Sequence, residues 1–248
     1  MSTATASHAG KPATTGATHF LLRRMHSLTG IVFGLYICVH LVVNATLIQG
    51  STHATDPTVF QQQVDKIHSL PFLEVVEWVA IYIPIIFHTV YGIYIVVTGQ
   101  PNVGTYNYGK NWAYFFQRVS AMILILFIAF HVLAMKGLLM IGGLTFDPAN
   151  ATASTIQHMH YNWIVGYIVY PVGILAACFH LANGFWTAAI TWGLTVSAAA
   201  QKRWGGVCVL IFLGTFAAGM TAWGAAITQS PTAQQLTTEH VAGDHYKP

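Results

Sequence analysis

The stretch RMHSLTGIVFGLYICVHLVVNATLI, Arg24 to Ile48, decides the fold class of this chain. A run of this length exceeds the roughly 20 apolar residues that an α-helix needs to cross the hydrocarbon layer of a bilayer. After Arg24 it carries no Asp, Glu, Lys or Arg, and the histidine deep in the run is His40. The sequence therefore predicts a transmembrane helix with a histidine inside it, and such a histidine needs a polar partner.

The same pattern recurs along the chain, which is 54% hydrophobic and only 7% charged over 248 residues. Further runs of this kind follow at Leu73 to Thr98, Tyr114 to Ile141, Tyr161 to Thr191 and Trp204 to Ile227. Each is too long for a helix buried in a soluble domain, and each is interrupted by glycine rather than by charge. We predict an all-α integral membrane protein with five transmembrane helices and no internal repeat.

The two ends of the chain differ from this middle part. Residues 1–19 are small and polar and lack the apolar core of a signal peptide, so we expect a flexible N-terminal extension. Residues 20–227 form the predicted membrane domain, and residues 228–248 form a second flexible tail. Cys38, Cys178 and Cys208 stand apart in apolar runs, which indicates small buried side chains rather than disulfides.

Lysine and arginine predict the orientation. With the N-terminus inside, seven basic residues lie on the inner side and three, Lys66, Lys136 and Lys247, lie outside. The seven are Lys11, Arg23, Arg24, Lys110, Arg118, Lys202 and Arg203. This bias predicts a cytoplasmic N-terminus and an external C-terminus in a bacterial cytoplasmic membrane. The inner band of positive charge would face anionic partners or lipid head groups.

Four histidines, His40, His88, His131 and His180, lie one in each of the first four runs. At 1.5 Å per residue, His40 and His131 lie about 24 to 26 Å from the inner face, and His88 and His180 lie roughly 15 to 17 Å from it. Matching by depth pairs His40 with His131 and His88 with His180, with a vertical offset of about 9 Å between the pairs.

A metal held by two imidazoles needs further ligands, and a porphyrin supplies four in a plane. Bis-histidine haem is therefore the predicted occupant of each pair, with two b haems bound within a bundle of the first four helices. Gly92 and Gly184 follow His88 and His180 by four residues and leave the same helical face bare for a flat ring. No Cys-x-x-Cys-His motif occurs, so covalent attachment is not indicated.

Other interpretations of the histidines exist. A haem-free transporter could use them to bind a transition metal or to relay protons, although the deep parts of the five runs contain no carboxylate. His26 and His40 have the fourteen-residue spacing of cytochromes that place two ligands on one helix, but no second run completes that pattern.

Residues near the membrane surfaces are candidates for haem propionates and quinone. Arg24, Arg118 and His26 lie at the inner level, where cations could pair with propionates, and Lys136 lies near the outer haem. Quinone chemistry moves protons with electrons and needs a titratable group. The outer candidates for that group are Asp65, His68, Glu74 and Glu77, of which Glu77 lies about one turn inside the boundary. An inner quinone site around Ser27, Arg24 and His26 is the alternative.

Six short motifs resemble one family. They are RRMHSLTG (23–30), HLVVN (40–44), SLPF (69–72), FHTVYGIYI (87–95), QRVSA (117–121) and FHLANGFWTAAITWGLTV (179–196). Over roughly Phe20 to Ala226 the chain is similar to the single-subunit, five-helix dihaem cytochrome b anchor of succinate dehydrogenase and fumarate reductase.

This resemblance implies a membrane-anchor subunit of succinate:quinone oxidoreductase, which takes no part in the dicarboxylate chemistry. A flavoprotein and an iron–sulfur subunit would dock on its cytoplasmic face and exchange electrons with quinone, commonly menaquinone. The family's four haem ligands fall on His40, His88, His131 and His180. A cytochrome b subunit of a hydrogenase or formate dehydrogenase is the alternative with different docking partners.

Overall fold

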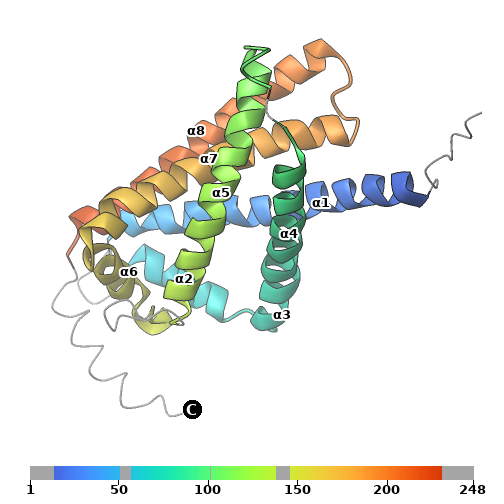
Figure 1. The fold of residues 1–248 in the computed structure, drawn as a ribbon. Helices are drawn as coiled ribbons and strands as arrows, with labels where there is room; N and C mark the ends of the chain where they lie inside the picture. Colours follow the sequence, from blue (N-terminus) through green and yellow to red (C-terminus); the bar gives the residue numbers. More distant parts are fainter. Residues whose placement is uncertain (1–13, 51–56, 101, 138–145, 231–248) are drawn as a thin grey trace, which may run out of the picture.

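The structure is a computed structural model that describes residues 14–50, 57–100, 102–137 and 146–230 of this chain. Within those ranges the regular secondary structure is helical (Figure 1). The long helices are α1 (Thr14–Ala45), α4 (Ile83–Thr98), α5 (Gly109–Met135), α7 (Tyr170–Thr191) and α8 (Ala198–Thr228). Short helices join them: η1 (Thr46–Ile48), α2 (Val59–His68), α3 (Leu73–Glu77), η3 (Pro148–Asn150) and α6 (Ala151–His160).

Five stretches are long and apolar enough to cross a membrane, which confirms the predicted fold class. They are Gly16–Ile48, Leu73–Thr98, Gly109–Met135, Val165–Thr191 and Ala198–Thr228. The second coincides with the run predicted from sequence. The first, third and fifth begin earlier than predicted because polar residues extend the helix before the apolar run, so α1 begins at Thr14, inside the predicted extension, α5 at Gly109 and α8 at Ala198. The fourth begins later, at Val165 instead of Tyr161, because α6 ends at His160 and a short break follows it. Helix α5 ends at Met135, and Gly137 follows with φ +70°; Ile141 lies outside the described residues.

Two of the spanning stretches change their helical geometry just before a proline. Residues Trp78–Tyr82 (η2) and Val165–Val169 (η4) form π-helical turns, and Pro84 and Pro171 follow them. Proline lacks an N–H and its ring collides with the carbonyl four residues earlier. A wider turn at that point removes the collision, so the helix passes through the proline with a local bulge.

Helix α7 lies at the centre of the bundle and contacts α1, α5 and α8. Nearly half of its most apolar segment is buried inside the protein, a larger share than in the other spanning helices. Small residues permit this close packing, since a β-carbon on Gly173 would lie 2.5 Å from the Phe127 ring and one on Gly219 would lie 2.6 Å from Ile174.

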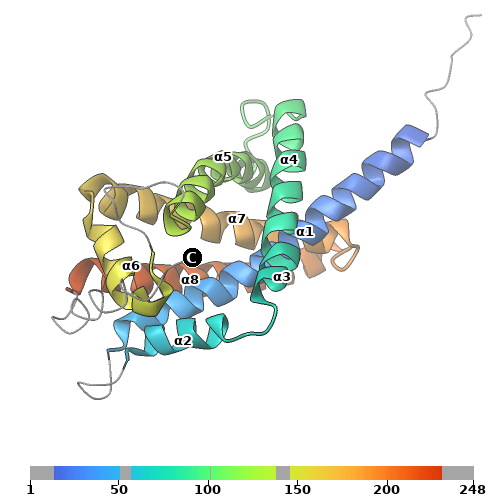
Figure 2. The ribbon, with the colours of Figure 1, turned by 90° about the horizontal axis from the view of Figure 1, so that it is seen from below.

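The connections gather at two ends of the bundle. The start of α1 and the α4–α5 and α7–α8 connections lie on one side, and α2, α3 and α6 lie on the other (Figures 1 and 2). We call these the inner and outer sides. On the outer side α2 and α6 are joined by Thr58 and Thr152, whose hydroxyl oxygens are 2.6 Å apart, and by Gln61, which accepts from the Ala151 N–H. Together these two short helices form a cap over the outer end of α7.

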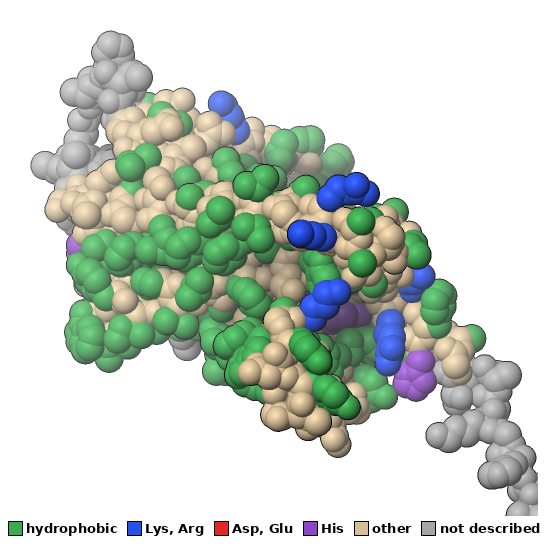
Figure 3. Space-filling model, turned by 90° about the horizontal axis from the view of Figure 1, so that it is seen from above, with side chains coloured by type: hydrophobic (Ala, Val, Ile, Leu, Met, Phe, Trp, Pro, Cys, Tyr) green, Lys and Arg blue, Asp and Glu red, His purple; other side chains and the backbone are tan. Residues whose placement is uncertain are grey.

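Acidic and basic side chains are distributed unevenly between the inner and outer sides. Within the described residues the acidic side chains, Asp65, Glu74, Glu77 and Asp147, are all on the outer side. The inner side carries Arg23, Arg24, Lys110, Arg118, Lys202 and Arg203. In Figure 3 lysine and arginine side chains surround a recess that exposes histidine, and no acidic side chain is visible on that face.

Candidate haem-binding sites

The structure brings the four membrane histidines together in two pairs. The ring centroids of His88 and His180 are 6.1 Å apart, and those of His40 and His131 are 6.0 Å apart. The pairs therefore link α4 with α7 and α1 with α5, as matching by depth predicted. Two metal–imidazole bonds of about 2.0 Å in line would put ring centres roughly 6 Å apart, so both separations suit a shared metal between the rings.

The inner pair borders a large cavity. A space of about 1350 Å³ lies between α1, α4, α5 and α7, and both His88 and His180 line it. This volume exceeds the roughly 300 to 1,000 Å³ of common small-molecule pockets. Gly92 and Gly184, the glycines singled out in the sequence, also line it, and a side chain at either position would reduce the space. The cavity thus has room for a large flat group beside the two imidazoles.

The second nitrogen of each inner ring is already occupied. Nδ1 of His88 lies 3.0 Å from the backbone oxygen of His26. Nδ1 of His180 lies 3.2 Å from both the hydroxyl of Ser120 and the backbone oxygen of Gln117. Metal-ligating histidines commonly donate this N–H to a carbonyl or another acceptor, which fixes the tautomer and leaves Nε2 for the metal. Both inner histidines have an acceptor within 3.2 Å of Nδ1, as this arrangement requires.

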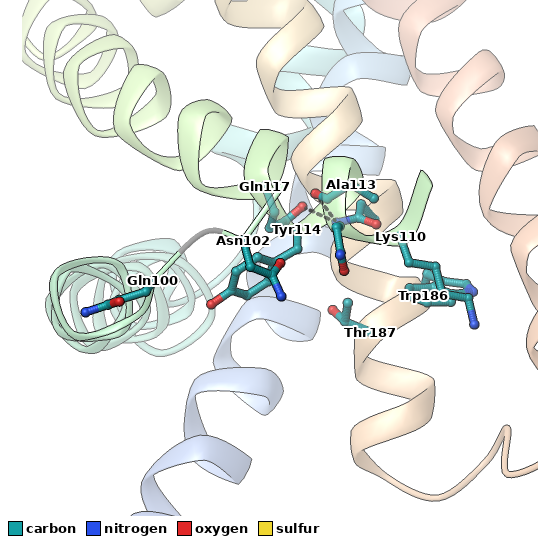
Figure 4. Close-up of a pocket in the computed structure, with 10 residues that line it drawn as sticks. Gln100, Asn102, Lys110, Ala113, Tyr114, Gln117, Trp186 and Thr187 are labelled. Carbon is teal, nitrogen blue, oxygen red and sulfur yellow. Dashed lines mark hydrogen bonds between the residues drawn. The ribbon is translucent and has the colours of Figure 1, made fainter. Parts of the chain in front are cut away.

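An amide clamp holds α5 and α7 together beside His180. Gln117 donates its Nε2 hydrogen to the backbone oxygen of His180 at 3.1 Å, and Asn183 donates to Oε1 of Gln117 at 2.8 Å. These residues also line a polar pocket of about 460 Å³ at the inner ends of the two helices (Figure 4). The clamp therefore joins the motifs at 117–121 and 179–196 in the folded chain.

Two buried polar atoms at the inner cavity have no hydrogen-bond partner among the described residues. They are Nδ1 of His26 and Nε of Arg118, and both side chains line the cavity. The His26 ring also stacks on His88, with centroids 4.0 Å apart. Buried donors without partners are costly, so this cavity is suited to an occupant that brings hydrogen-bond acceptors, such as carboxylates.

Arginine 24 does not line this cavity. Its guanidinium lies over the rings of Phe20 and Trp192, at 4.9 and 4.8 Å from their centroids, whereas Arg23 is among the lining residues. Consecutive helical residues point in directions about 100° apart, so only one of two adjacent arginines can face the cavity. Ser27 does line the cavity, and it accepts a hydrogen bond from the Trp192 indole at 3.1 Å. Sequence reasoning missed Arg23 and Trp192.

The outer pair has aromatic side chains around it. Nδ1 of His131 is 3.2 Å from the hydroxyl of Tyr170, and Phe127 stacks on the His131 ring at 5.8 Å. The contacts of His40 are longer: its Nδ1 is 3.5 Å from the hydroxyl of Tyr36 and its Nε2 is 3.4 Å from Asn44. Two imidazoles in van der Waals reach, each with a hydroxyl at Nδ1, form a donor set that suits bis-histidine iron.

The outer quinone candidates divide into exposed and partly buried residues. Asp65, His68 and Glu74 are exposed on α2 and α3. Glu77 is partly buried and forms an ion pair with Lys136, whose Nζ lies 3.1 Å from its carboxylate. The charges of Glu77 and Lys136 act on Tyr36, which is one helical turn before His40 and has its hydroxyl 3.5 Å from Nδ1 of that histidine. Lys136 therefore pairs with a carboxylate of the protein itself.

Fold and site together define a class of protein, a helical membrane protein with two histidine pairs at two depths. No family model matches the sequence. The chain is 34% identical over 210 residues to the succinate dehydrogenase cytochrome b558 subunit of Bacillus subtilis (strain 168), a match that covers 84% of this chain and 96% of that protein. The chain therefore belongs to the succinate dehydrogenase cytochrome b family, the membrane anchors of complex II.

This assignment confirms the resemblance read from the short motifs and makes the chain part of an oxidoreductase complex in the membrane. It decides against the hydrogenase and formate dehydrogenase alternative. Within the described residues no group of three or more histidine, cysteine or acidic side chains is arranged to hold a metal ion.

Proposed function

We propose that this anchor binds two b haems, one between His88 and His180 and one between His40 and His131, and that it is a quinone-reactive subunit. The observation that carries the proposal is the equal spacing of the two ring pairs, 6.1 and 6.0 Å. The name of the relative, a cytochrome b558, supports haem b as the bound group. When bound, haem b supplies a six-coordinate iron that carries single electrons.

The residues that line the inner cavity support an inner haem whose propionates face basic side chains. Arg118, His26 and Arg23 line the cavity, and each can donate a hydrogen bond to a carboxylate. Charge-assisted hydrogen bonds of this kind are stronger than neutral ones. We infer that these residues hold the propionates of the inner haem, and that Arg24 stabilises the α1–α7 contact through Phe20 and Trp192 instead.

We infer that the partner subunits dock on the inner side. The flavoprotein and iron–sulfur subunits of a succinate dehydrogenase are soluble proteins that need a polar surface on the anchor. The inner side has six basic residues and no acidic one within the described part of the chain, a distribution that favours both the cytoplasmic orientation and acidic docking surfaces. The C-terminal end of α8 then lies on the external side.

We place the quinone site on the outer side, at Glu77. Its carboxylate is partly buried at the membrane boundary, and it interacts with Tyr36 beside His40. Reduction of a quinone takes up two protons, so a carboxylate near the outer pair supplies what the reaction needs. The inner alternative around Ser27 has less support, because Trp192 already bonds to the Ser27 hydroxyl and Arg24 faces two aromatic rings.

The test is a haem count on the purified complex, with His180→Ala and His131→Ala as separate variants. We expect two haems in the parent complex and one in each variant, with different haems lost, as seen in reduced-minus-oxidised spectra and redox titration. A colourless, folded complex that oxidises succinate would refute haem binding. Equal loss of both haems in each variant would refute independent pairs.

A further inference from the structure

Tyr170 is the first residue of α7 and lies at the outer histidine pair. Its side chain is 7% exposed, and its hydroxyl is 3.2 Å from Nδ1 of His131. It follows the π-turn at Val165–Val169, whose wider geometry rotates the start of α7 relative to a regular helix. The position of the phenol therefore depends on the bulge before Pro171.

The phenol is held by aromatic contacts. The rings of Phe127 and Phe130 lie edge-on to it, with centroids 5.5 and 6.5 Å away. His158 of the outer cap also lies edge-on, at 6.4 Å, and its Nε2 is buried without a partner among the described residues. A buried hydroxyl fixed in this way has little freedom to leave His131.

The partner of His131 differs from those of the inner pair. His88 and His180 each have a backbone oxygen within 3.2 Å of Nδ1, which no side-chain substitution removes. His131 has a side-chain hydroxyl instead, and His40 has a more distant one at 3.5 Å. The Nδ1 atoms of the outer pair thus have side-chain partners, and Tyr170 is the nearer of the two.

We propose that Tyr170 is a positioning residue for the outer haem, which accepts the Nδ1 hydrogen of His131 and thereby fixes the ring and its donor strength. The proposal rests on the proposed function, since it requires a haem between His40 and His131. A ligand imidazole whose Nδ1–H is bonded is the stronger electron donor and favours ferric iron. Tyr170 therefore holds the potential of the outer haem below the value it would have without the hydroxyl.

The test is Tyr170→Phe in the complete complex, which removes one oxygen and keeps the ring that packs against Phe127 and Phe130. We expect both haems to be present. The potential of the outer haem should rise, and its low-spin electron paramagnetic resonance signal should shift. Transfer of the outer haem from the variant complex to apomyoglobin should be about 10- to 100-fold faster than from the parent complex. The potential of the inner haem should not change.

Phe130→Leu is the matched control, because it alters the packing around Tyr170 and removes no hydrogen bond. Equal shifts of the outer haem in both variants would overturn the proposal in favour of packing alone. An unchanged outer haem in Tyr170→Phe would overturn it as well, and so would loss of both haems in that variant. If the parent complex lacks a second haem, the proposed function itself fails, and this outcome is separate from the others.

Discussion

A β-carbon on Gly30 would lie 2.6 Å from Cε1 of His88, closer than two such carbons can approach. The α1 backbone therefore touches the imidazole ring of an α4 residue directly. This contact also places the His26 carbonyl, one turn earlier on α1, within 3.0 Å of Nδ1 of His88. Glycine at position 30 is thus part of the inner histidine pair, although it has no side chain.

Gly30→Ala is expected to displace the His88 ring and weaken the inner haem site. The methyl group overlaps the ring atoms, and a shifted ring loses its hydrogen bond to His26. Ligand misplacement of this kind lowers metal affinity by about 10-fold or more. The measurement is the haem content of the purified complex. Gly206→Ala on α8, where nothing lies within 4 Å, is the control; equal haem content in both would contradict the prediction.

Arg118 and Arg24 are expected to differ in their effect on the inner haem. A cation beside a haem favours ferrous iron, so Arg118→Gln should lower the potential of the inner haem. Only the part of the hydrogen-bond energy that differs between ferric and ferrous haem shifts the potential, so a total of about 1.5 to 3 kcal/mol sets an upper limit of about 65 to 130 mV for one electron. Arg24→Gln should leave the potential unchanged, because Arg24 does not line the cavity. Redox titration separates the two, and the reverse pattern would mean that the propionates face Arg24.

Glu77→Gln should abolish most quinone reduction and leave both haems reducible by succinate, because glutamine cannot carry the proton. Lys136→Met breaks the same ion pair and keeps the carboxylate, so it serves as the control. The pair is half-exposed at Lys136 and contributes at most about 1 kcal/mol to stability. Similar loss of quinone reduction in both variants would indicate a structural role for the ion pair.

The pH dependence of the ion pair follows from Lys136. Burial lowers the pKa of this amine, but the hydrogen bond and the charge of Glu77 outweigh burial and raise the pKa above its ordinary value of 10.5. A raised pKa means that this stabilisation is complete below about pH 10 and is lost only as pH rises further. The difference in thermal stability between the parent and Lys136→Met should therefore be constant from about pH 7 to 9. A clear change in that stability difference between pH 7 and 9 would contradict the prediction.

Asn183→Ala should loosen the clamp between α5 and α7. It removes the hydrogen bond to Gln117, which in turn bonds to the His180 backbone. Side-chain hydrogen bonds between membrane helices contribute about 0.6 kcal/mol on average and at most about 1.7. We expect the variant complex to lose its inner haem at a temperature a few degrees lower than the parent complex does. Asn111→Ala is the control, since the Asn111 side chain donates to the backbone oxygen of Tyr106, five residues away along the chain; an equal shift there would speak against the clamp.

The sequence alone predicted the number of spanning helices, the pairing of histidines by depth and the family. The helix number and the pairing depend on distances along one helix, because a rise of 1.5 Å per residue converts sequence position directly into depth. The family followed from the six short motifs. The run at Leu73–Thr98 was predicted to the residue, because loop residues flank its apolar segment. The roles of the histidines as haem ligands remain a proposal that the haem count will test.

The tertiary structure decided which neighbours the side chains of each helix face. Arg23 and Arg24 are adjacent and chemically alike, and only packing against Trp192 shows which of them faces the cavity. The π-turns before Pro84 and Pro171 rotate the residues that follow, and periodicity counted from sequence does not include them. The partners of the histidine Nδ1 atoms, among them Tyr170 and Ser120, lie 39 and 60 residues away along the chain. Sequence thus determined depth and helix number, because both are local, and the fold decided the contacts, because they join distant segments.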